Sequence, residues 1–166
     1  PLKLRNNLKK AVQLLNEAGF DFVDGKMTNL KTGEPLTFEI LSNSANGSTF
    51  TRVMLPFIAN LKKIGIEATF RTIEVNIFKN RMDNFDFDVA IMSYRMSQMP
   101  GNELKEMFGS ASADVKGSYN IMGIKNEVAD ALIEKIVTAQ TKAEYESSVM
   151  ALDRVLLDEY YLIFQW

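Results

Sequence analysis

The feature that most constrains the fold is a repeated change in the spacing of apolar residues along the middle of the chain. Apolar and polar residues alternate at residues 36–40 and again at 66–73, which is typical of half-buried strands. Residues 50–64 and, more briefly, 75–82 carry apolar side chains at helical spacing. A nearly continuous apolar run at residues 87–92 indicates a central strand covered on both faces. Because the connections are long enough for crossovers, the sequence predicts an α/β fold, with a mainly parallel sheet flanked by helices.

Further helices are predicted at residues 4–18, 127–137 and 142–158, and a strand-like run closes the sequence at 161–166. The chain has 166 residues, enough for one domain with a buried core, so we expect residues 1–166 to form a single domain. The last residues are apolar, whereas natural termini are usually polar. We therefore expect a fragment of a longer chain, in which the absence of a signal peptide says nothing about localisation.

Composition excludes several classes of function. The formal net charge is −2, which gives no basic field for a nucleic-acid partner. The chain has no cysteine and no histidine, so disulfides, thiolate catalysis, Ser-His-Asp chemistry and the common zinc sites are excluded. No phosphate-binding glycine loop, nucleophile elbow or dinucleotide fingerprint is present. We expect no catalytic residue, no metal and no cofactor.

The remaining candidates for chemistry are carboxylates. Asp86 and Asp88 alternate with phenylalanines at the start of the apolar run, where two carboxylates on one strand face could serve as a metal or acid/base pair. They precede the strand, at the edge opposite to the expected ligand site, so we interpret them as edge or cap residues. Glu103 begins a short helix. It can receive a cationic ligand group or stabilise the helix N-terminus, and the sequence leaves both roles open.

The polar stretch at residues 93–110 follows the predicted central strand, and open parallel sheets bind ligands beyond the carboxyl ends of their strands. Its Met, Ser and Asn residues offer adaptable apolar contacts and neutral hydrogen-bonding groups. The alternative is an ordinary surface loop, with Arg95 solvated and Met96 packed inward. With a later loop, this stretch supplies the candidate ligand-binding residues: Tyr94, Arg95, Met96, Ser97, Asn102, Glu103, Ser118 and Asn120.

Segments spread over the whole chain resemble, in order, the family 5 extracellular solute-binding proteins, which are the peptide and nickel receptors of ABC importers. They are LKKAVQLLNEAGF, GEPLTFEIL, LPFIANLKKIGIEATFRTIE, FKNRMDNFDFDVAIMSY, NEVADALIEKI and LDRVLLDEYYLIFQW. Within the family, MPGNELKEMFGSASADVKGSYNIMGI is most similar to the Yej-type oligopeptide receptors, with Met99 in place of their Ser and Phe108 in place of their Trp.

The resemblance implies two α/β lobes with a cleft between them, of which residues 1–166 would be the second, carboxy-terminal lobe. It implies a periplasmic or cell-surface-anchored protein that captures an oligopeptide by lobe closure, without catalysis, and delivers it to the membrane subunits of an ABC importer. The first lobe of the same chain would be missing, and we expect the fragment to be monomeric. Residues 93–110 would form the cleft wall.

One departure from the family pattern concerns the ligand's amino terminus. Dipeptide receptors of the family place an Asp shortly after the cleft strand, whereas the equivalent residue here is Met96 or Ser97. Neither can pair with an α-ammonium group. The alternatives are that Glu103, backbone carbonyls or the missing lobe hold the amino terminus, or that nothing holds it.

Two other classes of function compete with transport. One is a ligand-sensing or interaction α/β domain that is not coupled to transport. The other is an enzyme that uses Asp86, Asp88 or Glu103, against which the absence of histidine and cysteine argues.

Overall fold

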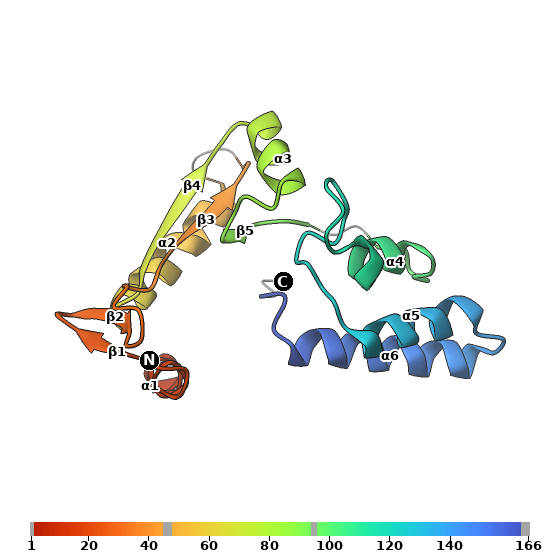
Figure 1. Cartoon of the computed structure of the whole chain (residues 1–166), viewed down its shortest axis with the longest axis horizontal. Coiled ribbons are helices and arrows are strands. Elements are labelled where there is room, and N and C mark those ends of the chain that lie inside the picture. The colour runs from red at the N-terminus through yellow and green to blue at the C-terminus, as the bar shows by residue number, and fades with distance from the viewer. Residues whose placement is uncertain (1, 45–47, 94–95, 164–166) are drawn as a thin grey trace. The chain divides into compact units, whose positions relative to one another are not determined.

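The computed structural model describes residues 2–44, 48–93 and 96–163, which Figure 1 shows as a ribbon. These residues divide into two units. The first comprises residues 1–79 and 87–92, and the second comprises residues 80–86 and 93–166. The expectation that residues 1–166 form a single domain stays a prediction.

A parallel sheet of three strands forms the middle of the first unit. The strands are β3 (Thr37–Ser42), β4 (Glu67–Thr72) and β5 (Val89–Ala90), in the spatial order β4-β3-β5. Ile40 of β3 lies opposite Phe70 of β4 and opposite Val89 of β5, and both pairings are parallel. The predicted α/β fold with a parallel sheet is therefore confirmed.

The position predicted for the apolar run at residues 87–92 was wrong. Among the described residues β5 pairs only with β3, and Val89 and Ala90 are only half-buried. The central strand is β3, in which Ile40, Leu41 and Ser42 are buried. An apolar run reports how strongly a segment prefers burial, whereas the order of strands depends on which side of β3 each crossover places its strand.

The first unit begins with α1 (Leu2–Glu17), followed by the hairpin strands β1 (Phe20–Val23) and β2 (Lys26–Asn29). The turn between these strands contains Asp24 at φ 50° and Gly25 at φ 82°, and such positive values are typical of tight hairpin turns. Helix α2 (Thr49–Lys62) leads to Gly65, whose φ is +74°. A β-carbon at residue 65 would lie 2.6 Å from the Met27 nitrogen, so only glycine fits there.

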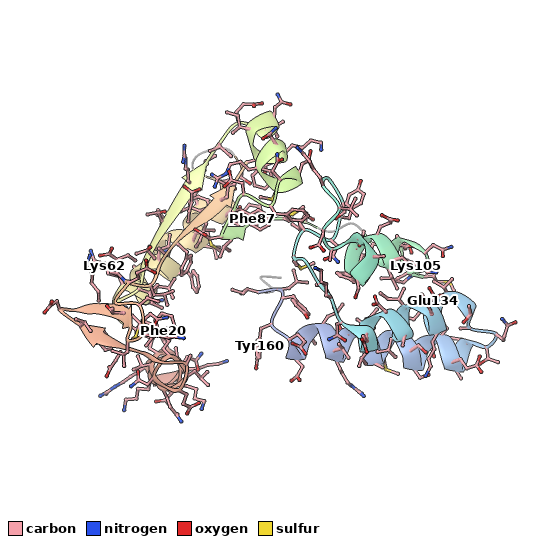
Figure 2. The ribbon with its side chains drawn as sticks, viewed as in Figure 1. Phe20, Lys62, Phe87, Lys105, Glu134 and Tyr160 are labelled. Atoms are coloured by element: carbon pink, nitrogen blue, oxygen red, sulfur yellow. The ribbon has the colours of Figure 1, made fainter. Side chains whose placement is uncertain are left out.

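The second unit is mainly helical. It contains α4 (Glu103–Phe108), the short 3-10 helix η1 (Ser110–Ser112), α5 (Glu127–Thr138) and α6 (Lys142–Asp158), whereas α3 (Val75–Asp83) spans the boundary between the units. Helices α5 and α6 lie side by side (Figure 1). Their core is closed by α4, and its buried members are Leu104, Met107, Phe108, Ile124, Ala129, Ile133, Ile136, Leu152 and Leu156. Lys105 of α4 points toward Glu134 of α5, and their side chains form an ion pair of 2.6 Å (Figure 2).

Every helix predicted from the sequence is present in the structure, within a few residues at each end. The expected strand at residues 161–166 is not formed by its described residues 161–163, and residues 164–166 lie outside the described part. No helix in the described ranges is long and apolar enough to cross a membrane.

Candidate functional site

The candidate ligand-binding residues that the structure describes lie on two loops of the second unit, one before α4 and one between α4 and α5, and at the first residue of α4. Tyr94 and Arg95 lie outside the described residues. On the first loop, Met96, Ser97 and Asn102 are exposed. Met99 of the same loop is 75% exposed and is the most exposed methionine among the described residues.

Glu103, the first residue of α4, binds back to the loop that precedes it. Its Oε1 accepts a hydrogen bond from Ser97 Oγ at 3.0 Å, and its Oε2 accepts one from the Gly101 backbone nitrogen at 3.0 Å. Hydrogen bonding from its own backbone N–H, from Ser97 and from Gly101 lowers the pKa of the Glu103 carboxyl below its ordinary value. The side chain is therefore a carboxylate near neutral pH, with one donor on each oxygen.

Tyr145 holds the same loop from α6. Its hydroxyl donates a hydrogen bond of 2.8 Å to the backbone oxygen of Pro100, 45 residues earlier in the chain. Burial raises the pKa of Tyr145, and the negative charge of Glu103 raises it further. The phenol thus keeps its proton and remains a donor.

Asn120 fixes the second loop. Its side chain is 0% exposed, its Nδ2 donates to the oxygens of Gly109 and Ile124 at 3.0 Å each, and its Oδ1 accepts from the Ile124 nitrogen at 2.9 Å. Ser112 Oγ donates to the oxygen of Gly109 as well, at 2.8 Å. A β-carbon at Gly109 would lie 2.5 Å from the Lys105 oxygen, so the chain leaves α4 through a space that only glycine fits.

The two candidates of the second loop both point inward. Ser118 is half-buried, and its Oγ is shielded from solvent without a hydrogen-bond partner in the part of the chain that is described. The nitrogen and the oxygen of the Asn120 side-chain amide both form hydrogen bonds within the unit. This residue therefore supports the loop and presents no polar atom at the surface. Between them Tyr119 is 64% exposed.

Of the predicted site residues, the structure brings Ser97 and Glu103 into direct contact and places Asn102 beside them on the surface. Sequence reasoning missed Tyr145, because its apolar ring fits the buried stripe of α6 and no local pattern indicates a bond to Pro100. It also passed over Tyr119. The only signal for Tyr119 was its position between two polar residues in an irregular stretch.

Asp86 and Asp88 each have a polar partner within the fold. Asp88 Oδ2 accepts a hydrogen bond from the Glu39 nitrogen at 2.9 Å, and Asp86 pairs with Arg81 at 3.1 Å. No group of three or more potential metal-ligating side chains gathers within the described ranges.

Comparison with known proteins identifies the family. Residues 1–115 match the model of the bacterial extracellular solute-binding proteins, family 5 Middle. The chain belongs to this family. The resemblance inferred from the sequence segments is thereby confirmed.

Among similar proteins, "Probable peptide-binding protein YejA" of Agrobacterium fabrum is 45% identical over all 166 residues, which cover 26% of that protein. "Peptidoglycan-binding protein YepA" of the same organism is 33% identical over 159 residues, 96% of this chain and 25% of that one. The chain therefore spans about a quarter of the length of the curated relatives it matches.

A similar solved structure is the oligopeptide-binding protein AppA from Bacillus subtilis in complex with a nonapeptide. It has a TM-score of 0.81 and 25% identity, and the match covers 92% of this chain and 30% of AppA.

Proposed function

We propose that this chain is part of the second lobe of an extracellular or periplasmic receptor that captures oligopeptides and delivers them to an ABC importer. The ligand is enclosed between this lobe and a first lobe of the same protein, and it is released unchanged. The observation that carries the proposal is the similarity over the entire chain to a probable peptide-binding protein. The likeness to a receptor in complex with a nonapeptide supports it.

The proposed ligand contacts lie on the loop before α4, where exposed thioethers stand beside neutral polar groups. Thioethers adapt to side chains of different shape, and neutral donors and acceptors can pair with a peptide backbone. The contacting residues are Tyr94, Arg95, Met96, Ser97 and Asn102. Glu103 acts by holding this loop, since both of its oxygens accept hydrogen bonds from it. Ser118 of the second loop is not among the contacts, because its hydroxyl is shielded from solvent. Asn120 contributes by holding that second loop in place.

The proposal is tested by calorimetry on the full-length receptor with peptides of three to nine residues and, separately, with soluble peptidoglycan fragments. The second arm is included because a relative is named for binding peptidoglycan. We expect peptides to bind and to remain intact by mass spectrometry. Binding of peptidoglycan fragments alone, or cleavage of the peptide, would contradict the proposal.

Two variants test the proposed contacts. Met96→Asp places a charge at an exposed apolar contact, and Asn102→Ala removes an exposed amide that makes no capping bond to α4. We expect each to weaken peptide binding several-fold with an unchanged melting temperature. Unchanged affinity in both variants would place the peptide site elsewhere.

Lobe closure is tested by small-angle X-ray scattering of the full-length receptor. Enclosure of the peptide by two lobes brings their centres of mass together, so we expect the radius of gyration to fall when a bound peptide saturates the protein. A radius that does not change on saturation would argue for binding to an open surface.

A further inference from the structure

The loop before α4 is held at three residues by two side chains that come from outside it. Glu103 accepts hydrogen bonds from Ser97 and Gly101, at the two ends of a five-residue segment. Between these points, Tyr145 of α6 donates to the Pro100 oxygen. We call this arrangement the 97–101 clamp.

The clamp holds a segment whose own side chains face solvent. Gln98 is exposed, and Met99 is 75% exposed. An exposed loop ordinarily keeps much of its conformational freedom, and fixing its residues in one conformation costs entropy. Here the half-buried phenol of Tyr145 and the carboxylate of Glu103 hold a loop that presents the flexible thioether of Met99 to solvent. Such an arrangement is typical of a contact surface that must be in place before its partner arrives.

We propose that Tyr145 and Glu103 are positioning residues that preorganise Met99, and Met96 beside the clamp, as the contact for an apolar side chain of the bound peptide. This inference rests on the proposed function and adds to it the class of ligand side chain. A thioether is polarisable and apolar, so it favours aliphatic side chains over polar ones of similar size.

Each positioning residue is suited to its task. Tyr145 is half-buried against the core of the second unit, so its hydroxyl has a fixed position from which to hold Pro100. Glu103 is the only charged side chain within residues 96–103, and both of its oxygens face donors of the loop. Removing either group frees the segment without deleting an apolar contact.

The test uses calorimetry on the full-length receptor with pentaalanine and with five peptides that each carry one leucine in a pentaalanine background. The selectivity is the Kd for pentaalanine divided by the Kd for the tightest leucine peptide. We expect Tyr145→Phe and Glu103→Gln to lower this selectivity about threefold to tenfold, as loss of one hydrogen bond to the loop predicts. Met99→Ser should lower it to a similar extent, because it removes the contact itself.

Tyr160→Phe is the matched control, since Tyr160 is an exposed tyrosine just after α6 and far along the helix from Tyr145. It should leave the selectivity unchanged. A merely structural role of Tyr145 would lower the melting temperature and weaken all six peptides equally, and this result would overturn the inference. Parent-like selectivity in Tyr145→Phe or in Met99→Ser would do the same. If the parent protein binds none of the peptides, the proposed function itself fails.

Discussion

The two units order their backbones in different ways. In the first unit most of the described chain lies in helices, in strands of the parallel sheet or in the β1-β2 hairpin, so regular backbone hydrogen bonds fix it. In the second unit the described residues between Ser93 and Asn126 form only α4 and η1 as regular elements, and side chains bind many of their backbone groups. Asn120, Ser112, Glu103 and Tyr145 each bind backbone groups there.

This difference between the units indicates where a single substitution can change the shape of the protein surface. A strand keeps its backbone hydrogen bonds with any side chain except that of proline, so most substitutions in the first unit act through apolar burial. A loop that a few polar side chains hold can change shape when one of them is lost. The loop proposed to contact the ligand belongs to this second kind.

The largest effect is expected from opening a cavity in each hydrophobic cluster. Ile133 is 2% exposed in the large cluster of the second unit, and Ile66 is 6% exposed in the smaller cluster with Met27 and Ile64. We expect Ile133→Ala and Ile66→Ala each to lower the free energy of unfolding by about 2–5 kcal/mol, with Ile133→Ala the more costly because its surroundings are more completely packed. Urea unfolding measures both values, and a larger loss for Ile66→Ala would contradict the comparison.

The next largest effect on stability is expected from the loss of buried side-chain hydrogen bonds in the second unit. Asn120→Asp replaces a donor that serves two backbone oxygens by an acceptor at a fully buried site. We expect a loss of about 2–4 kcal/mol in the free energy of unfolding, comparable to losing a core isoleucine.

Ser118→Ala is the matched substitution two residues away. It removes a shielded hydroxyl that has no partner among the described residues, so stability should be unchanged or higher by up to about 1 kcal/mol. Urea unfolding of both variants provides the measurement. Equal destabilisation by the two substitutions would show that hydrogen bonding does not order this loop.

The smallest effect is a pH dependence at Glu103. Its pKa lies below the ordinary value of 4.5 in the folded state, so its ionised form stabilises the fold at pH values above 4.5. This contribution is lost as the pH falls below 4.5 and through the folded-state value. The difference in unfolding free energy between the parent and Glu103→Gln should therefore be present at pH 7 and shrink by pH 3.

The measurement is urea unfolding at a series of pH values, with Glu106→Gln as the control for removing one carboxylate from α4. A difference between the parent and Glu103→Gln that is the same at pH 7 and pH 3 would show that the charge of Glu103 does not support the clamp.

The sequence by itself determined the helices, the α/β class and the family. These follow from local spacing, from turn residues such as Gly65, and from segments that can be compared one by one. Helical spacing repeats within a few residues, so each predicted helix could be recognised without knowledge of its neighbours. The sequence also indicated the loop before α4, which contains Ser97, and the first residue of α4, Glu103, as parts of the candidate site.

Only the tertiary structure decided the order of the strands and the roles of single loop residues. That β3 and not β5 is central depends on where two crossovers place their strands, and an apolar run carries no such information. Ser118 and Asn120 have side chains typical of a polar site, yet both turn inward because the loop closes around them. The bond from Tyr145 to Pro100 joins residues 45 positions apart, and only folding of the second unit brings these two groups together.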